Sequence, residues 1–251
     1  NPRYCLYYTS NDGKIVQPYK SSAFGATIIS NTYIDGVGVI DFNATITTIG
    51  NYAFYDCISL KSVTIPDSVT TIGDDAFCQC YNLTSVNIPD SITEIGYQAF
   101  AYCFSLTSVN IPDSVTTIGM EAFSSCSILQ EFNGKFASED GRCLIIDGTL
   151  NSFAPAGLTE YAIPDSVTEI GDRAFSGCYS LTSVTIGDSV TTIGDNAFAG
   201  CDSLTSVTIG KGVTSFGASV FAGCTGELII NSNIPSVSSP EYSPFYNSQF
   251  T

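Results

Sequence analysis

Hydrophobic and polar positions repeat along most of this chain with a period of 23 residues. The repeated unit reads Ile-Gly-x-x-Ala-Phe-x-x-Cys and occurs, with variations, seven times. Its glycines are Gly50, Gly73, Gly96, Gly119, Gly171, Gly194 and Gly217. Its cysteines are Cys57, Cys80, Cys103, Cys126, Cys178, Cys201 and Cys224. A fixed period of this length is typical of a solenoid, in which each repeat buries its apolar face by stacking on its neighbours.

One repeat shows which elements the pattern predicts. Leu60, Val63 and Ile65 are apolar at the spacing Leu-x-x-Val-x-Ile. Ser62 and Thr64 alternate with them. This alternation predicts a short strand with one buried face and one exposed face.

A corner and a second extended edge are expected to follow each of these strands. Pro66 and Asp67 favour a turn, because Pro fixes φ and Asp can bond its own turn backbone. Val69 and Ile72 then predict the second edge, and Gly73 ends it. The glycine indicates either a positive φ or a close approach to the next coil.

Repetition predicts columns of identical side chains. The columns expected in the core are Val63, Val86, Val109, Val184 and Val207, and Phe54, Phe77, Phe100, Phe123, Phe175, Phe198 and Phe221. Strands of successive coils run the same way, so they should form a parallel sheet with coils roughly 4.7–4.9 Å apart. The predicted fold class is a mainly-β repeat solenoid, a right-handed coil of about eight stacked turns of 23 residues.

The period breaks once, where the motif glycines at positions 119 and 171 lie 52 residues apart. This distance equals one 23-residue coil plus one coil enlarged to 29 residues. Asp147 and Gly148 separate the apolar runs 143–146 and 149–153, which predicts a β-hairpin in place of the second edge. Residues 138–141 would form its polar entry loop. Such an insertion either carries specificity or is a tolerated decoration.

The two ends of the chain depart from the repeat. Residues 4–8 and 15–16, on either side of 11–13, are expected to pair as a hairpin within an N-terminal cap. Residues 37–42 should then resume the strand register of the repeat, whereas 227–230 are out of register. The expected parts are a cap with a hairpin (1–36), a first repeat block (37–128), a modified coil (129–157), a second repeat block (158–226) and a C-terminal tail or start of a further module (227–251).

Composition restricts the partners of the protein. Its 24 acidic and eight basic residues give a net charge of −16, which disfavours nucleic acid and anionic lipid. The sequence has no apolar run of 18 residues, so we expect no membrane span. The chain as given shows no signal peptide, and we expect Asn1 to begin a trimmed or mature form.

Seven of the ten cysteines occupy one position of the repeat, next to the core phenylalanine. Buried free cysteine behaves as a small hydrophobe, so we expect a stacked and mostly reduced column. Cys5, Cys78 and Cys143 lie outside this column, and a bridge that involves one of them is the alternative. Cys78-x-Cys80 stands alone as a metal motif, without a second pair or any histidine.

The absence of histidine removes the commonest general base and the Ser-His and Cys-His dyads. We therefore expect no enzyme, no cofactor and no metal centre. Carbohydrate hydrolysis is the alternative, and it requires a carboxylate pair outside the repeat positions that faces one groove. The turn carboxylates instead follow the repeat, at Asp67, Asp90, Asp113, Asp165 and Asp188. Turn chemistry explains them, and a weak interaction of this ladder with divalent cations is the alternative.

Tyrosines gather around the Ala-Phe-x-x-Cys segment, which we call the arc of each coil. They are Tyr52, Tyr55, Tyr81, Tyr97, Tyr102 and Tyr179. Their rings either stack on sugars or fill the surface between coils.

The unit from Cys57 to Phe77 reads Cys-x-Ser-Leu-x-Ser-Val-Thr-Ile-Pro-Asp-Ser-Val-Thr-Thr-Ile-Gly-x-x-Ala-Phe. It closely resembles the repeat of the BspA-like, or Treponema pallidum-type, leucine-rich repeat family, and the resemblance covers about residues 37–226. The segments 7–14 and 139–148 also resemble elements found around such repeats. The resemblance implies a secreted or cell-surface protein, often of host-associated bacteria, for which adhesion to matrix proteins, host cells or other bacteria has been proposed.

The late repeats depart from the family pattern. Gly187 and Gly210 replace the proline of the turn, Phe216 replaces isoleucine, and Val220 replaces alanine before the core phenylalanine. These repeats are looser than the central ones. Proteins with similar repeats commonly continue beyond the point where this chain stops, and the sequence leaves open whether the chain is a fragment of a longer array.

Our main hypothesis is a non-enzymatic recognition module at a cell surface that adheres to a host or bacterial protein or glycan. The candidate ligand-binding residues are the small polar side chains of the exposed strand face, Ser62, Thr64, Ser85, Asn87, Ser108, Asn110, Glu131, Asn133, Ser183, Thr185, Ser206 and Thr208. The same residues would also keep that face soluble. The alternative function is a structural spacer in a longer surface protein. The sequence names neither the ligand nor an oligomeric state.

Overall fold

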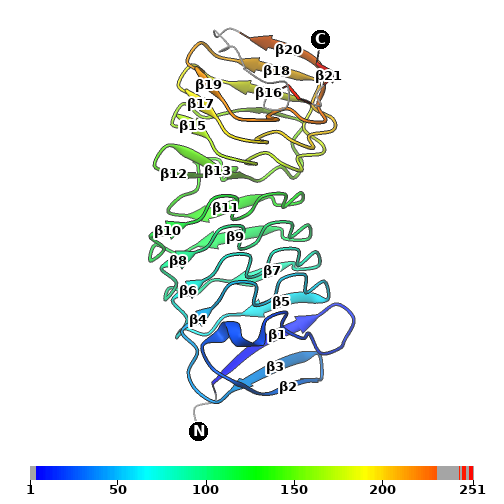
Figure 1. Ribbon diagram of the computed structural model, residues 1–251, viewed down its shortest axis with the longest axis vertical. Coiled ribbons are helices and arrows are strands. Elements are labelled where there is room, and N and C mark those ends of the chain that lie inside the picture. Colours follow the sequence, from blue (N-terminus) through cyan, green and yellow to red (C-terminus); the bar gives the residue numbers. More distant parts are fainter. Residues whose placement is uncertain (1–3, 231–242, 244, 247–248, 251) are drawn as a thin grey trace. The chain divides into compact units, whose positions relative to one another are not determined.

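A computed structural model describes residues 4–230, 243, 245–246 and 249–250 of the chain. The chain forms two compact units, Asn1–Lys135 (unit 1) and Phe136–Thr251 (unit 2). Both units consist of β-strands joined by turns, and no α-helix occurs in the described part (Figure 1). The predicted fold class is confirmed, because the chain is a mainly-β solenoid of about seven turns with repeats of about 23 residues.

Unit 1 starts with an antiparallel cap and continues into repeating coils. The cap elements are β1 (Cys5–Ser10), the 3-10 helix η1 (Ser21–Phe24), β2 (Ile28–Ile34) and β3 (Val37–Phe42). The longer coil strands are β5 (Leu60–Thr64), β7 (Ser85–Asn87), β9 (Ser108–Ile111) and β11 (Glu131–Gly134). The two-residue strands of the second edge are β4 (Thr48–Ile49), β6 (Thr71–Ile72), β8 (Glu94–Ile95) and β10 (Thr117–Ile118). The strand orders are β2-β3-β1-β5-β7, β11-β9 and β10-β8-β6-β4, and the coil strands pair in parallel.

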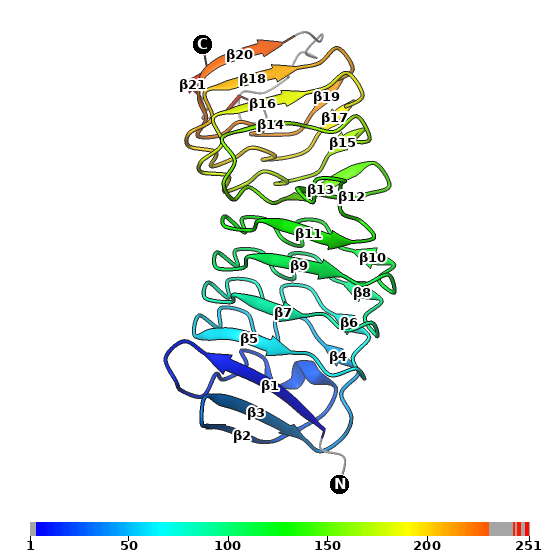
Figure 2. The same ribbon diagram turned by 180° about the vertical axis from the view of Figure 1, so that it is seen from behind.

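Unit 2 repeats this arrangement after a hairpin. The hairpin strands are β12 (Cys143–Ile146) and β13 (Thr149–Phe153). The longer strands are β14 (Glu160–Ala162), β16 (Ser183–Ile186), β18 (Ser206–Ile209) and β20 (Thr225–Ile230), followed by β21 (Gln249–Phe250). The second edge contains β15 (Glu169–Ile170), β17 (Thr192–Ile193) and β19 (Ser215–Phe216). The two sheets have the orders β12-β13-β15-β17-β19 and β14-β16-β18-β20-β21 (Figure 2).

The predicted hairpin of the enlarged coil is confirmed. β12 and β13 are antiparallel, and Ile146 pairs with Thr149 across the Asp147-Gly148 turn. β13 is also parallel to β15, where Leu150 pairs with Ile170. The hairpin therefore replaces the second edge of its coil, as the Asp-Gly signal between two apolar runs predicted.

The hairpin predicted between residues 4–8 and 15–16 is wrong. β1 instead lies between β3 and β5 and is antiparallel to both. Val16 is buried, and its N–H donates to the Tyr8 hydroxyl at 3.1 Å, so this segment packs under the sheet as a loop. The hairpin of the cap is β2–β3, whose turn residues Asp35 and Gly36 both have positive φ, of 53° and 86°. This Asp-Gly signal is the one that the sequence interpretation overlooked.

The prediction that residues 37–42 resume the repeat register is also wrong. These residues form β3, which is antiparallel to β1 and β2, so Ile40 pairs with Leu6 and Asn31. Leu6 and Ile40 are fully buried, and Phe24 of the cap meets the core ring of Phe54 in the first coil, with ring centroids 5.6 Å apart. The apolar spacing of β3 thus serves an antiparallel cap sheet, in which an alternating strand has the same pattern as in a parallel one.

The phenylalanine column is the centre of each core. In unit 1 the rings of Phe77 and Phe100 stack with centroids 5.1 Å apart and 4° between their planes. In unit 2 Phe198 and Phe221 stack at 5.4 Å, and Phe245 from the C-terminal tail adds a further ring at 5.9 Å from Phe221. Each of these column residues except Phe245 is buried completely. The apolar face of each coil is therefore covered by its neighbours, as in other solenoids.

The motif glycines permit a close approach of the backbone and do not have positive φ. A Cβ atom on Gly96 would lie 2.5 Å from the main-chain nitrogen of Asp74 in the preceding coil. Positive φ occurs at two other positions of the arc instead. In unit 1 the first of these positions holds Tyr52, Asp75, Gln98 and Glu121. The second position, four residues later, holds Asp56, Gln79, Tyr102 and Ser125. In unit 2 this second position is glycine, at Gly177, Gly200 and Gly223. A non-glycine residue in this region costs roughly 1–2 kcal/mol.

Polar side chains of each turn bond to the backbone of a neighbouring coil. The Ser91 hydroxyl donates to the Val69 carbonyl at 2.6 Å. The Asp74 carboxylate accepts from the Tyr97 N–H at 2.8 Å. These bonds recur with the repeat, and they satisfy backbone groups that the short strands leave without a partner.

The last coil is shorter by two residues. Val207 of β18 pairs with Leu228 of β20, a separation of 21 instead of the usual 23. The segment 227–230 is therefore out of register in sequence, as predicted, yet it continues the parallel ladder. The predicted C-terminal tail or further module (227–251) falls mostly on residues 231–242, 244, 247–248 and 251, which lie outside the described residues.

Candidate ligand-binding surface

The predicted strand face of unit 1 exists as rows of polar side chains in register. Ser62 pairs with Ser85 and Thr64 with Asn87 between β5 and β7. Between β9 and β11, Ser108 pairs with Glu131 and Asn110 with Asn133. All eight side chains are exposed except that of Ser62, which is partly exposed. We call these rows the strand face of unit 1.

Unit 2 presents the remaining four candidates in the same way. Ser183 pairs with Ser206 and Thr185 with Thr208, and only Thr185 is fully exposed. The neighbouring strand adds Glu160 to the row of Ser183, a residue that the sequence interpretation missed. The repeat pattern could have identified it. Glu160 lies two residues after Leu158, just as Ser62 lies two residues after Leu60.

The cap extends the strand face of unit 1 beyond the repeats. Because β1 pairs with β5, Thr9 lies opposite Ser62, and their hydroxyl oxygens are 2.6 Å apart in a hydrogen bond. Tyr7 lies opposite Thr64 and is 44% exposed. Periodicity could not reveal these residues, because β1 does not repeat and runs antiparallel to the coils.

A polar hollow of about 600 Å³ opens at the end of the strand face of unit 1. Its lining residues are Asp67, Asn87, Ile88, Pro89, Asp90, Ser91 and Asn110. The hollow thus joins two predicted face residues, Asn87 and Asn110, to the turns of two successive coils. Its amides and carboxylates offer donors and acceptors in one concave place.

The turn carboxylates follow each other along the coils, and one of them bonds to the backbone of the next coil. Asp188 accepts a hydrogen bond from the Lys211 N–H of the next coil at 2.7 Å. No group of three or more Asp, Glu, Cys or His side chains able to hold a metal ion is found in the described ranges. The weak interaction with divalent cations therefore stays a prediction.

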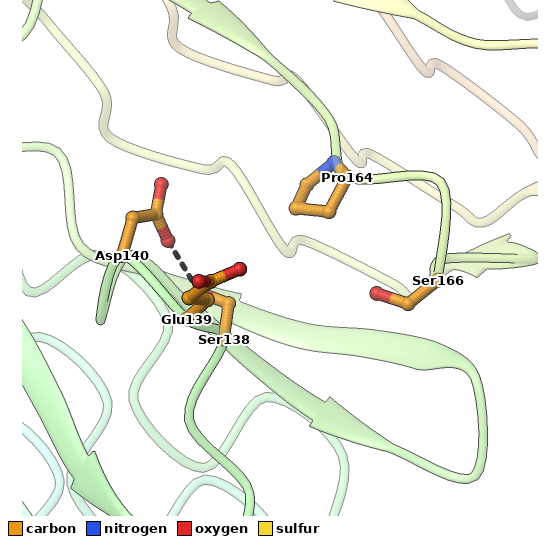
Figure 3. Close-up of a pocket in the computed structure, with 5 residues that line it drawn as sticks. All are labelled: Ser138, Glu139, Asp140, Pro164 and Ser166. Carbon is orange, nitrogen blue, oxygen red and sulfur yellow. Dashed lines mark hydrogen bonds between the residues drawn. The ribbon is translucent and has the colours of Figure 1, made fainter.

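A second hollow, of about 500 Å³, lies beside the inserted hairpin (Figure 3). Ser138, Glu139 and Asp140 from the entry loop form one side, and Pro164 and Ser166 from the turn before β15 form the other. The dashed line in Figure 3 is the bond from the Ser138 hydroxyl to the Asp140 carboxylate, at 2.6 Å. The entry-loop residues of this hollow lie outside the repeat, whereas Pro164 and Ser166 belong to a repeated turn, so the hollow joins the insertion to a regular coil and is the second candidate site.

Hydrogen bonds hold Asp140 in its charged form. Burial alone would raise its pKa, but donors from Ser138, the Arg142 N–H and the Tyr161 hydroxyl outweigh burial and lower the pKa. The Tyr161 hydroxyl lies 3.0 Å from Asp140 and 3.2 Å from the sulfur of Cys143. Burial raises the pKa of Cys143 to about 12. This cluster orders the loop and contains an ionised carboxylate beside a protonated thiol.

All ten cysteines are buried and carry free thiols. Five column members donate their thiol hydrogen to the main-chain carbonyl of the phenylalanine 26 residues earlier; they are Cys80, Cys103, Cys126, Cys201 and Cys224. Burial raises the pKa of Cys126 to about 12 and that of Cys57 to about 11. These thiols are protonated near neutral pH, so they lack the thiolate that nucleophilic or metal chemistry needs.

None of the helices in the described part of the chain is long and apolar enough to cross a membrane. The one helix present there, η1, has four residues.

The sequence profile of the BspA type leucine rich repeat region matches six copies, over residues 32–138 and 149–251. The chain belongs to this family. The resemblance inferred from the Cys57–Phe77 unit is thereby confirmed, and the match includes residues beyond both predicted ends of the repeats. Among curated proteins, none matches the chain.

Solved structures of bacterial leucine-rich repeat proteins share the fold. A leucine rich cell surface protein from Faecalibacterium prausnitzii A2-165 is 28% identical, with a TM-score of 0.60, over 82% of this chain and 64% of that chain. A leucine-rich repeat protein from Eubacterium ventriosum ATCC 27560 is 28% identical, with a TM-score of 0.61, over 76% of this chain and 59% of that chain. The pneumococcal vaccine antigen PcpA is 17% identical, with a TM-score of 0.61, over 82% of this chain and 64% of that chain, and shows the fold alone. The chain spans less than two thirds of the length of these structures.

Proposed function

We propose that this protein is a non-enzymatic recognition module at a bacterial cell surface that binds a protein or glycan ligand. The observation that carries the proposal is the polar hollow at Asn87 and Asn110, which lies at the end of an exposed and in-register polar face. The membership of the family supports it, because one similar protein is described as a leucine rich cell surface protein.

The strand face of unit 1 suits recognition for a physical reason. Parallel pairing places side chains of the same kind side by side on a rigid backbone, so little conformational entropy is lost on binding. The hollow adds a concave anchor with carboxylates, amides and a hydroxyl. Asp67 and Asp90 in its lining also favour ligands that present hydrogen-bond donors, such as amides and sugar hydroxyls.

Carbohydrate hydrolysis finds less support at the second hollow. Glu139 and Asp140 lie outside the repeat positions, which the enzyme alternative requires. They are adjacent on one loop, however, and the opposite wall consists of Pro164 and Ser166. The pKa of Asp140 is lowered, whereas a glycosidase general acid needs a raised pKa. We therefore assign this hollow no hydrolytic role.

An array of matrix proteins, bacterial surface proteins and glycans tests the proposal. The purified 251-residue chain should show saturable binding to at least one class of ligand. Binding should be competed by the same ligand in solution and lost when the chain is unfolded. A chain that stays folded yet binds nothing on the array would favour the spacer alternative, in which another part of a longer protein binds.

A further inference from the structure

The arcs of unit 1 carry aromatic side chains that form two clusters. In the first, Tyr55 contacts Tyr19 of the cap and Tyr52, with ring centroids 5.3 Å and 5.7 Å apart. In the second, Phe104 stacks on Tyr81 at 5.2 Å and meets Tyr102 edge-on at 6.2 Å. All six rings are exposed or partly exposed. We call them the arc face of unit 1.

Gln79 joins the two clusters into one surface. Its amide nitrogen donates to the Tyr55 hydroxyl at 2.9 Å, and its amide oxygen accepts from the Tyr81 hydroxyl at 3.1 Å. Gln79 and Tyr102 occupy the positive-φ position that is glycine in all three arcs of unit 2. Unit 1 thus keeps side chains where the backbone favours glycine, and these side chains belong to the arc face.

Carboxylates accompany these rings in the arcs, and the arcs contain no basic residue of their own. The Asp75 carboxylate raises the pKa of Tyr52 through its charge, and it accepts a hydrogen bond from the Tyr52 hydroxyl. Asp75 is 8% exposed, so it cannot be fully hydrated. The four arcs, residues 50–59, 73–82, 96–105 and 119–128, contain four carboxylates and neither Lys nor Arg. A tyrosine that donates to a carboxylate has a more negative ring face, which attracts cations more strongly.

We propose that the arc face of unit 1 binds a basic peptide segment of a partner protein, with Lys or Arg side chains placed over the tyrosine rings. Charge complementarity selects this occupant, because the four arcs combine aromatic faces with carboxylates and contain neither Lys nor Arg, and Lys20 of the cap is the one basic residue next to a ring of this surface in sequence. Guanidinium and ammonium groups gain from both features, since they stack on the rings and lie near the acidic groups. This surface is separate from the strand face and from the hollow at Asn87.

Fluorescence anisotropy with a labelled peptide that alternates arginine with glycine tests this inference. A peptide of the same length with neutral citrulline in place of arginine is the ligand control. The double variant Tyr55→Leu, Tyr81→Leu keeps the net charge and removes two rings, so we expect arginine-peptide binding to weaken by about tenfold. Tyr55→Phe with Tyr81→Phe keeps the rings and should bind within about threefold of the original chain.

A matched variant separates the rings from general acidity. Asp67→Asn, Asp90→Asn and Asp113→Asn remove three charges outside the arcs and should change arginine-peptide binding less than the leucine variant does. Equal affinity of the leucine variant and the original chain for the arginine peptide would overturn the inference. Equal affinity of the original chain for the citrulline and arginine peptides would also overturn it. Displacement of the arginine peptide by a neutral oligosaccharide would also overturn it, because the occupant would then be a glycan. If the leucine variant melts early, the two peptides decide on the original chain: equal affinity for the arginine and citrulline peptides would still overturn the inference.

Discussion

The thiol of Cys80 donates a hydrogen bond to the main-chain carbonyl of Phe54, with 3.1 Å between sulfur and oxygen. The same carbonyl accepts from the Cys57 N–H at 3.1 Å, so both of its lone pairs are used. The thiol bond recurs between coils with a separation of 26 residues, three more than the repeat. The constant spacing of cysteine and phenylalanine in the repeats of this chain places the thiol of each coil where it can bond to the arc of the preceding coil.

Alkaline pH should destabilise the protein through these thiols. The pKa of Cys126 is raised by burial to about 12, whereas an unfolded thiol ionises near about 8.5. The folded state therefore keeps protons that the unfolded state loses. The stabilising contribution is complete below the unfolded pKa and is lost as the pH rises toward the folded pKa. Urea unfolding at rising pH should show a fall of about 1.4 kcal/mol per pH unit for each ionising thiol. Cys126→Ala should make the free energy of unfolding fall less steeply with pH, by the contribution of one thiol. An unchanged pH dependence in this variant would argue against this account.

Truncation of a central phenylalanine should be costly. Phe100 stacks on rings at 5.1 Å and 5.2 Å on its two sides, and Phe100→Ala opens a cavity between them. We expect a loss of about 3–5 kcal/mol in the free energy of unfolding. Phe245→Ala serves as the control, because Phe245 is partly exposed and lies at the end of the column. Denaturant unfolding that gave equal losses at both positions would contradict the stacked column.

Two glycines should respond differently to alanine. Gly96→Ala places a Cβ 2.5 Å from Asp74 N and 2.6 Å from Gly73 C, both main-chain atoms, so the coils must separate. We expect a loss of about 3 kcal/mol or more. Gly200→Ala meets no atom within 4 Å, and only its φ of +71° opposes the change. Its cost should be about 1–2 kcal/mol. Thermal melting of both variants measures the difference, and the reverse order would refute the role assigned to close approach.

The aspartate that follows the motif glycine should stabilise the next coil by accepting a hydrogen bond from its backbone. Asp195 accepts a hydrogen bond from the Ala218 N–H at 2.7 Å. Asp195→Ala leaves that donor without its partner and should cost about 1 kcal/mol. Asp195→Asn keeps an oxygen at the same place, so its stability should lie closer to that of the original chain. If chemical denaturation shows the asparagine variant to be as unstable as the alanine variant, the charge and not the hydrogen bond is responsible.

Periodicity predicted the parts of the fold that repeat. The parallel strands, the phenylalanine column and the hairpin at Asp147 and Gly148 followed from spacing and from a local turn signal. The cap was predicted incorrectly, because its pairing partners are distant in sequence and β1 is antiparallel to β5. The sequence of a strand that does not repeat does not indicate which strand it pairs with. The alternating pattern of β3 fits both a parallel and an antiparallel sheet.

The candidate site was predictable to a similar extent. Side-chain alternation located the exposed face that includes Asn87 and Asn110. The hollow beside them depends on the turns of two coils, which sequence spacing does not place in space. For the glycine at the end of the second edge, the sequence left two explanations open, a positive φ or a close approach of the next coil. Gly96 shows the close approach and has no positive φ.

Binding to the ligand found on the array is the most direct test of the strand face of unit 1. Asn87→Lys with Asn110→Lys fills the hollow and adds two charges, whereas Thr93→Lys with Thr116→Lys adds the same charges at exposed positions beside the second edge. The dissociation constant of the asparagine variant should rise by about tenfold or more, and its melting temperature should stay within about 3 °C of the original chain. The threonine variant should bind like the original chain. Full binding by the asparagine variant would contradict the account and would move the search to the hollow beside the inserted hairpin.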